Sequence, residues 1–146
     1  MSMFSLFSKK NGGPAPEEAP AREAGASALT EYSPLALAFL GDAVYSVLVR
    51  ERLMKLGGRP ETLHALSVDA VRASAQSRAA DRLQPYLTDA EKDIYRRGKG
   101  ADPKHCPSGV DKLTYSKATG LETLFGWLYA EGRTDRAKEL FDYCME

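Results

Sequence analysis

The sequence predicts an all-α fold, a helical bundle around two central apolar helices. Apolar residues recur at three- and four-residue spacing, capping residues bracket these segments, and no segment alternates apolar and polar residues as a strand does. The chain of 146 residues is 43% hydrophobic and 27% charged, which suits one globular domain with a modest core.

The N-terminal segment, residues 1–31, is expected to be a disordered tail. Between residues 11 and 28 Gly, Pro, Ala and Glu dominate, and no large apolar residue is available for burial. The few apolar residues before them precede Lys9 and Lys10, which reverses the order in a signal peptide, and no apolar run is long enough to cross a membrane. We therefore expect a folded domain over residues 32–146, no membrane partner and a cytoplasmic location.

The first helix of this domain is predicted to begin at Pro34, with Ser33 as its N-cap. An apolar run follows over residues 35–54, and Gly57 and Gly58 end it. Because apolar residues occupy nearly every side of this helix, it should lie at the centre of the bundle with other helices around it.

Two helices are expected after Pro60, over residues 61–66 and 68–84. Ala, Val and Leu recur at helical spacing in the second of them, and Pro85 closes it.

Another helix is predicted to begin at a capping box formed by Thr88 and Glu91, and to reach Arg97. Gly98 and Gly100 should end this helix. Residues 98–110, which are rich in Gly and Pro, should form a loop.

A long helix should run over residues 112–130, and Gly132 should end it before Thr134 caps a last helix through Tyr143. The two long apolar helices, residues 34–56 and 112–130, are expected to pack against each other near the centre of the domain.

The formal net charge is zero, with 20 basic and 20 acidic residues, so any surface for a polyanion must be a local patch. Cys106 and Cys144 have no CxxC spacing and should be reduced thiols rather than a disulfide scaffold. His64 and His105 do not supply the paired spacing of a zinc site, which we set aside.

Asp42 is a carboxylate in an apolar stripe of the first helix. Leu35, Phe39 and Tyr45 share its helical face. Burying an ionised carboxylate there is costly unless it is hydrogen-bonded, paired with a cation or bound to metal. The alternative is a solvated or capped aspartate beside Gly41.

Glu122 repeats this pattern in the second long helix, where Tyr115, Ala118, Phe125 and Tyr129 share its face. Two such carboxylates on two central helices could meet and hold a divalent hard cation. Oxygen ligands suit Mg²⁺, and Mg²⁺ suits phosphate chemistry. The alternative is a structural acid bonded to a neighbouring lysine.

Residues 40–45 (LGDAVY) resemble the signature helix of the ribonuclease III superfamily, and residues 122–129 (ETLFGWLY) resemble its second acidic motif. The segment between them is similar to the Mini-ribonuclease III branch. The residues that carry this similarity are Leu63, His64, Val71, Ala73, Ala75, Gln76, Arg97, Gly98, Lys99, Pro107, Asp111, Thr114, Tyr115 and Thr119. The resemblance extends over residues 34–132.

The resemblance implies the ribonuclease III endonuclease-domain fold without the double-stranded-RNA-binding domain that follows it in ordinary ribonuclease III. It implies a bacterial endoribonuclease that cleaves double-stranded RNA, leaves 5′-phosphate and 3′-hydroxyl ends, and matures the ends of 23S ribosomal RNA precursor. Asp42 and Glu122 would be the catalytic residues and the ligands of Mg²⁺, for which Mn²⁺ could substitute. The wider superfamily carries further acids where this chain has Ala38 and Thr119.

A basic patch is expected to bind RNA, because backbone phosphates are the natural partners of clustered lysine and arginine. Its members are Arg96, Arg97, Lys99 and Lys104, and Asp102 is the one opposing charge. The alternative, a solvated helix end that complements the C-terminal dipole, accounts for the two arginines but not for the two lysines.

Phe39 precedes the LGD motif at a place where superfamily members keep an aromatic residue that crosses the dimer axis into the partner's pocket. The resemblance therefore implies a symmetric homodimer, whose paired sites would let both strands of a duplex be cut. The alternative is that Phe39 is an ordinary core residue.

The two acids also separate the functions that one fold can serve. A catalytically silent RNA-binding or ribosome-assembly factor is the alternative to the enzyme, and a helical protein-interaction module is a third hypothesis. A silent relative would be free to lose costly carboxylates, whereas Asp42 and Glu122 are both present. We therefore expect an enzyme.

Overall fold

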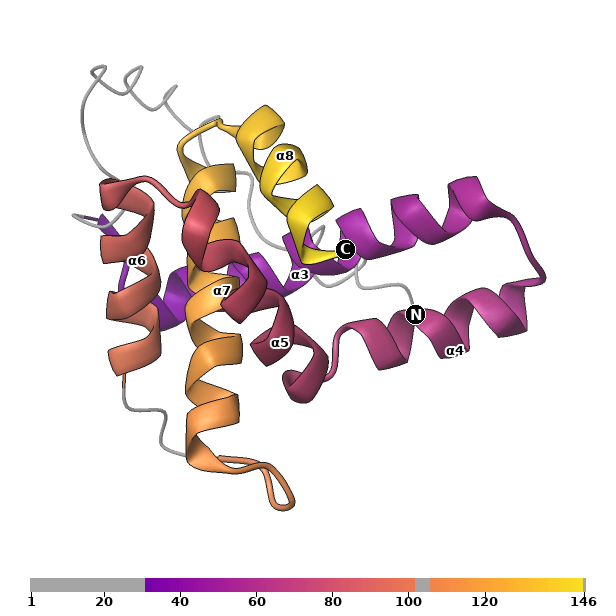
Figure 1. The fold of residues 1–146 in the computed structure, drawn as a ribbon, viewed down its shortest axis with the longest axis horizontal. Coiled ribbons are helices and arrows are strands. Elements are labelled where there is room, and N and C mark those ends of the chain that lie inside the picture. The colour runs from indigo at the N-terminus through magenta and orange to yellow at the C-terminus, as the bar shows by residue number, and fades with distance from the viewer. Residues whose placement is uncertain (1–30, 102–105, 146) are drawn as a thin grey trace, which may run out of the picture.

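A computed structural model describes residues 31–101 and 106–145, so the tail predicted over residues 1–31 lies outside the described residues except for Glu31. Every regular element in the described part is a helix, which confirms the predicted all-α class (Figure 1). The elements are α3 (Pro34–Leu56), α4 (Pro60–Ala70), α5 (Ala73–Leu83), the short 3-10 helix η1 (Gln84–Tyr86), α6 (Asp89–Gly100), α7 (Lys112–Ala130) and α8 (Thr134–Cys144).

Helix α7 is the centre of the bundle and contacts α3, α5, α6 and α8 (Figure 1). It spans the predicted residues, and Asp111 caps it by accepting a hydrogen bond from the Thr114 amide at 2.9 Å. Between Ala118 and Leu128 every residue except Glu122 is buried. Its most extensive contact is with α3, which confirms that these two apolar helices pack together at the centre.

The main chains of α3 and α7 touch where they cross, and two glycines make this possible. A Cβ atom on Gly41 would lie 1.6 Å from the carbonyl oxygen of Glu122, and one on Gly126 would lie 1.9 Å from the carbonyl oxygen of Leu37. Any side chain at either position would push the helices apart. The glycine that interrupts the apolar run of α3 is therefore a packing residue.

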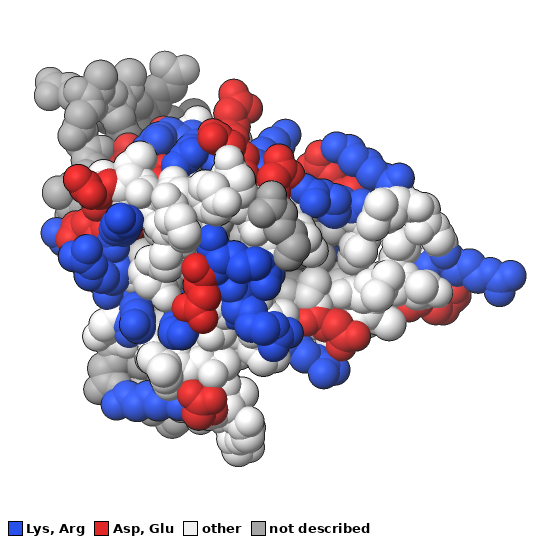
Figure 2. All heavy atoms as spheres, in the orientation of Figure 1, with Lys and Arg blue, Asp and Glu red and all other residues white. Residues whose placement is uncertain are grey.

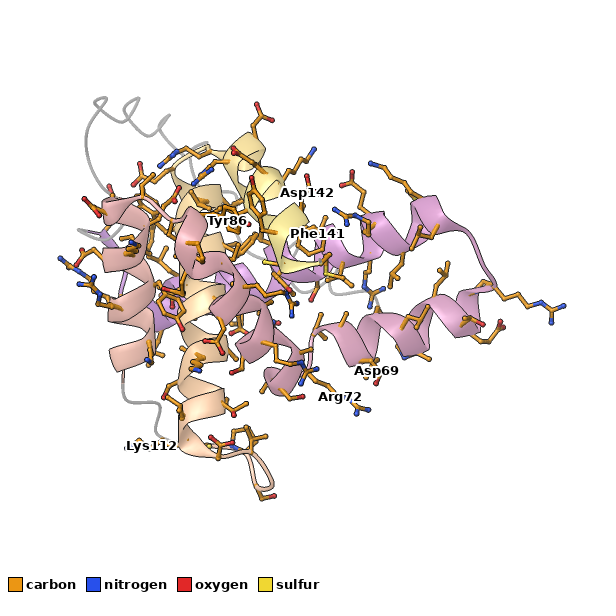
Figure 3. The ribbon with its side chains drawn as sticks, viewed as in Figure 1. Asp69, Arg72, Tyr86, Lys112, Phe141 and Asp142 are labelled. Atoms are coloured by element: carbon orange, nitrogen blue, oxygen red, sulfur yellow. The ribbon has the colours of Figure 1, made fainter. Side chains whose placement is uncertain are left out.

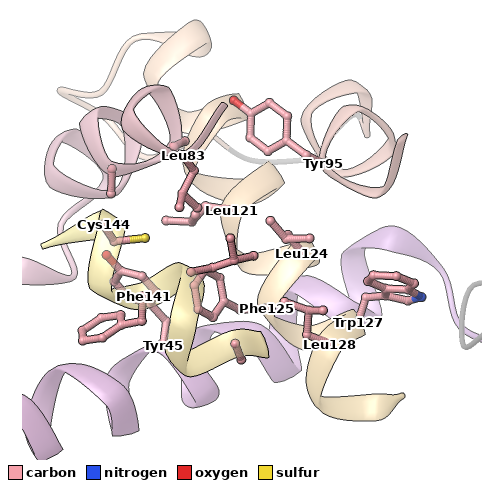
Figure 4. Packing of buried hydrophobic residues seen from close by; sticks show 14 of the residues in the cluster. Tyr45, Leu83, Tyr95, Leu121, Leu124, Phe125, Trp127, Leu128, Phe141 and Cys144 are labelled. Carbon is pink, nitrogen blue, oxygen red and sulfur yellow. The ribbon is translucent and has the colours of Figure 1, made fainter. Parts of the chain in front are cut away.

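The core lies around this crossing, where α5, α6 and α8 pack on α7. Tyr45 of α3 meets Phe125 of α7 and Phe141 of α8 edge to face, with ring centroids 5.3 and 5.4 Å apart (Figure 4). Such pairs contribute about 0.5–1.5 kcal/mol beyond the area they bury. Cys144 is buried beside them and Cys106 is exposed; both are free thiols, as expected.

Helix α8 is fastened to α3 by Arg52. This side chain pairs with Asp142 and lies over the ring of Phe141, 5.2 Å from its centroid; Figure 3 shows both α8 residues on the side of α8 that faces α3. The helix begins at Thr134, but its N-cap is Arg133, so the prediction that Thr134 is the cap is wrong by one residue.

Helix α6 begins at the predicted capping box. The Thr88 amide donates to Glu91 Oε2 at 2.8 Å, and the Glu91 amide donates to Thr88 Oγ1 at 3.2 Å. The helix does not stop at Gly98, contrary to expectation, because this glycine is buried against α7. A Cβ atom there would lie 2.3 Å from Thr123 Oγ1, so Gly98 permits a close helix contact instead of ending a helix.

The boundary between α4 and α5 lies at Val71 and Arg72, later than the predicted break at residue 67. Ser67 is buried within α4, and its hydroxyl donates to the carbonyl of His64 at 2.7 Å. This serine bonds back to its own helix instead of starting a new one.

Helix α3 is less enclosed than its apolar sequence predicts. Its C-terminal half pairs with α4 in an arm that projects from the bundle (Figure 1). Several large apolar residues of α3 stay exposed in this single chain: Leu35, Phe39, Val47, Met54 and Leu56. The expectation that other helices surround it holds only in part, because α7, α4 and α6 pack against it while these apolar residues stay exposed. No helix of the described residues is long and apolar enough to cross a membrane.

Candidate active site between helices α3 and α7

The crossing of α3 and α7 brings Asp42 and Glu122 together. Asp42 follows Gly41, and Gly41 lies against the main chain of Glu122 itself, where a Cβ would come within 1.6 Å of its carbonyl oxygen. The two carboxylates are close enough for the charge of Asp42 to raise the pKa of Glu122. The close approach that the glycines allow therefore also places the two acids as neighbours.

The two acids differ in exposure. Asp42 is exposed, and Leu35 and Phe39 on its helical face are 39% and 85% exposed, whereas Tyr45 on the same face is 1% exposed. The apolar stripe is therefore core at Tyr45 and surface at Leu35 and Phe39. The prediction of a buried Asp42 is wrong, and the alternative of a solvated aspartate describes its exposure. Glu122 is half-buried and interrupts the buried run of α7.

The surroundings of Glu122 disfavour its charged form. Burial raises the pKa of Glu122, the nearby charge of Asp42 raises it further, and the amide of Gln76 opposes the rise; the resulting pKa is about 7. No lysine or arginine of the described residues forms an ion pair with Glu122, so the alternative of a structural acid bonded to a lysine finds no partner there. A cation placed between the two carboxylates would offset both the desolvation penalty of Glu122 and the repulsion between the two negative charges.

At the two positions where the superfamily has further acids, this chain has buried residues that are not acidic. Ala38 and Thr119 are buried, and the Thr119 hydroxyl donates to the carbonyl of Tyr115 on its own helix at 3.0 Å. The described residues contain no group of three or more acidic, histidine or cysteine side chains placed to hold a metal. Two neighbouring carboxylates still suit Mg²⁺, which is usually held by one or two carboxylates and completes its shell with water and substrate phosphates.

Gln76 of α5 is the residue of this site to which sequence reasoning gave no role. It is 1% exposed, and its Nε2 has no hydrogen-bond partner among the described residues. The amide lowers the pKa of Glu122, which places it near that carboxylate, although the pair does not meet the geometry of a hydrogen bond. The sequence does carry a signal for Gln76: it is a polar residue on the helical face that Ala79, Ala80 and Leu83 make apolar. Glu122 presents the same anomaly in α7.

The basic patch is only partly described. Arg96 and Arg97 are exposed near the end of α6 and Lys99 is half-buried, while Lys104 lies outside the described residues. Arg97 pairs with Asp93 at 3.0 Å on the surface. Figure 2 shows basic side chains gathered over α6 with acidic ones among them. Because α6 continues to Gly100, Lys99 falls within its last turn, and the helix-dipole alternative accounts for it as well.

The patch is nevertheless tied to the acid pair through α7. Gly98, between Arg97 and Lys99, lies against Thr123, the residue after Glu122. The Thr123 hydroxyl donates to the carbonyl of Thr119 at 2.8 Å and also reaches the carbonyl of Pro34 at 3.2 Å. The end of α6 and the start of α3 therefore meet on the same turn of α7.

Phe39 is 85% exposed, so the alternative that it belongs to the core of this chain is wrong. Large aromatic side chains seldom face water without a partner, and here Leu35 is exposed on the same side of α3.

Comparison with known proteins gives one consistent family. The model of the family described as ribonuclease III domain matches residues 35–133. The chain is 39% identical over 115 residues to a Mini-ribonuclease 3 of Thermoanaerobacter sp. (strain X514), covering 78% of this chain and 81% of the relative. It is 42% identical over 108 residues to a Mini-ribonuclease 3 of Symbiobacterium thermophilum, covering 73% of this chain and 83% of the relative. A crystal structure of a protein from Fusobacterium nucleatum superposes with a TM-score of 0.73 at 27% identity, covering 82% of this chain and 97% of that one.

Proposed function

This chain belongs to the ribonuclease III domain family, and from that premise we propose that it is a magnesium-dependent enzyme whose Asp42 and Glu122 hold the metal for phosphodiester hydrolysis. An endoribonuclease activity on double-stranded RNA follows from the family. The metal, its ligands, the 5′-phosphate and 3′-hydroxyl products and the natural substrate are the proposed part.

The carboxylate pair is the observation that carries the proposal. Glu122 has a pKa of about 7 because it is half-buried and close to Asp42, and such perturbed acids cluster at functional sites. The metal, when bound, supplies a water of lowered pKa and stabilises the leaving oxygen. Mn²⁺ has similar ligand preferences and is expected to substitute for Mg²⁺.

The difference in exposure suggests a division of labour between the acids. Glu122, half-buried beside Gln76, would anchor the cation to the rigid centre of the bundle. Asp42, which is exposed, would hold it where an RNA phosphate can reach the remaining positions. No side chain needs to act as a covalent nucleophile in this scheme.

The RNA backbone is proposed to contact the basic patch formed by Arg96, Arg97, Lys99 and Lys104. The end of α6 packs on the turn of α7 that carries Glu122. A strand bound along this end of α6 would therefore run close to the carboxylates. The ion pair of Arg97 with Asp93 is exposed, so exchanging it for a phosphate costs little.

A homodimer would complete the enzyme. One carboxylate pair per chain suits one strand, and a two-fold symmetric pair of chains would place two sites on a duplex. The exposed Phe39 and its exposed neighbour Leu35 supply an apolar surface for such a contact.

The natural substrate is proposed to be the paired ends of 23S ribosomal RNA precursor in bacteria, because the relatives are bacterial Mini-ribonuclease 3 proteins. The enzyme would then work in the cytoplasm, where ribosomal RNA is processed. The alternative, a silent RNA-binding or assembly factor, leaves unexplained why two mutually repelling carboxylates are kept together.

Incubation of the purified protein with a long RNA duplex tests the proposal. We expect cleavage with Mg²⁺, no cleavage after chelation with EDTA, restored cleavage with Mn²⁺ and no cleavage of an unpaired strand of the same sequence. Duplex binding should weaken steeply with salt, because phosphate contacts release counterions. Duplex binding without cleavage at any metal concentration would favour the silent factor.

A further inference from the structure

Gln76 lies on the buried face of α5, which packs against α7. Ala79, Ala80 and Leu83 on the same face are all buried, and Gln76 itself is 1% exposed. An amide in such surroundings has lost its water and needs protein partners.

The amide nitrogen of Gln76 lacks such a partner. Its Nε2 and the indole nitrogen of Trp127 are the buried side-chain polar atoms of the described residues without a hydrogen bond. An unsatisfied buried donor destabilises the folded chain, because it has lost its water and gained no partner. Gln84, just after the same helix, shows the ordinary solution, because its Nε2 donates to the carbonyl of Ala80 at 2.9 Å. Gln76 makes no such bond. Its helix packs against α7, and its amide lies close enough to the Glu122 carboxylate to lower the pKa of that group.

We propose that Gln76 is a positioning residue: its Nε2 donates a hydrogen bond to the Glu122 carboxylate once that carboxylate holds the divalent cation, and so fixes which oxygen faces the metal. The inference rests on the proposed function. An amide suits this task because it supports the carboxylate without adding a negative charge beside Asp42. Ala38 and Thr119 provide no acid to do the same work in this chain.

Metal affinity measured without RNA tests this role. Mn²⁺ binding to the full chain is followed by electron paramagnetic resonance for the wild type and Gln76→Met, which keeps the length of the side chain but removes the donor. Partners that orient a metal ligand typically change affinity by about 10–100-fold when removed. We expect a loss in that range for Gln76→Met, and no change for the matched control Gln84→Met.

Two further measurements separate positioning from packing. Gln76→Met should unfold at the same temperature as the metal-free wild type or higher, because the substitution removes an unsatisfied buried donor. In a Glu122→Gln background, Gln76→Met should weaken residual Mn²⁺ binding no further, because it acts through Glu122. Gln76→Leu replaces Gln76→Met should the latter fail to fold.

The result that overturns the inference is a Mn²⁺ affinity of Gln76→Met within about twofold of wild type while Glu122→Gln binds Mn²⁺ much more weakly than wild type. A collapse of folding in both Gln76→Met and Gln76→Leu would also overturn it, since the amide would then be a structural residue. Equal Mn²⁺ binding by wild type and Glu122→Gln would instead contradict the proposed metal site itself.

Discussion

At the scale of single residues, Glu122 is the most informative one, because its surroundings disfavour its charged form. It is the one half-buried position in a buried run of α7, and Asp42 lies beside it. Its folded-state pKa of about 7 stands above the ordinary value of 4.5. The metal-free folded chain therefore holds a proton in this interval that the unfolded chain has lost, and its stability falls as pH rises toward and through 7.

Glu122→Gln should remove this decrease in stability with rising pH. We expect the metal-free variant to gain roughly 1–3 kcal/mol in the free energy of unfolding at about pH 8 relative to wild type, and to match it more closely at about pH 4. Urea unfolding in EDTA at both pH values measures the difference. The control Glu61→Gln changes an exposed carboxylate of α4 and should leave the pH dependence as it is. A pH dependence of Glu122→Gln equal to that of wild type would mean that the carboxylate is not strained.

The sequence identified these acids by their apolar neighbours, and this worked for one of them. Glu122 is half-buried, and Ala118 and Phe125 on its face are buried as the helical spacing predicts, although Tyr129 is 51% exposed. Asp42 is itself exposed, because Leu35 and Phe39 on its face are exposed and only Tyr45 is buried. Periodicity tells which residues share a face, but the exposure of that face depends on what else packs there. Gln76 went unassigned for a related reason, since its partner comes from another helix.

At the scale of helices, the crossing of α3 and α7 depends on Gly41 and Gly126. Helix limits were largely predictable from caps, as the ends of α3 and α7 show. Gly98 was not, because a glycine that permits close packing looks in the sequence like a glycine that ends a helix. Close helix contact is a tertiary property and leaves no local signal.

Gly41→Ala tests the crossing. The added Cβ would lie 1.6 Å from the Glu122 carbonyl oxygen, so the helices must separate. We expect a loss of about 3 kcal/mol or more in the free energy of unfolding, together with weaker Mn²⁺ binding as the acids move apart. Gly100→Ala is the control, because nothing lies within 4 Å of its Cβ, and it should be neutral or slightly stabilising. A Gly41→Ala variant as stable as wild type would contradict the close crossing.

A second test at this scale concerns the junction of α6 and α8. Burial raises the pKa of Glu91, but hydrogen bonds from Arg136 and the Thr88 amide outweigh it and hold the pKa low. Arg136 Nε donates to Glu91 Oε1 at 2.8 Å, and Glu91 is completely buried. Because the folded-state pKa is lowered, this stabilisation is present at neutral pH and is lost as pH falls through and below the ordinary value.

Glu91→Gln should cost roughly 3–5 kcal/mol at neutral pH, because it leaves the Arg136 charge without its buried partner. Glu139→Gln is the control, since Glu139 pairs with the same arginine at 3.0 Å but is 58% exposed; it should cost about 0–1 kcal/mol. Thermal unfolding of both variants decides. Equal losses of stability in the two variants would show that the buried ion pair contributes no more than the exposed one.

At the scale of the whole molecule, the exposed apolar residues of α3 supply the surface for the proposed homodimer. Phe39→Glu should give a folded monomer, because a charge on a self-complementary contact meets its own copy across the axis. Light scattering and circular dichroism measure the two properties. Leu113→Glu, which replaces another exposed apolar residue, should leave the mass unchanged. A wild-type chain that is monomeric and cleaves duplex RNA at full rate would contradict the dimer.

The central claim is that Asp42 and Glu122 together hold the metal that cleaves RNA. Its most direct test is single-turnover cleavage of an end-labelled RNA duplex by Asp42→Asn and by Glu122→Gln over a range of Mg²⁺ concentrations. Each variant should lose at least ~100-fold in rate at saturating Mg²⁺, because several kcal/mol of transition-state stabilisation depend on the metal. Each should still fold and bind the duplex with largely unchanged affinity, since the contacts of the basic patch with the phosphates are left in place. Cleavage near the wild-type rate by either variant would contradict the claim.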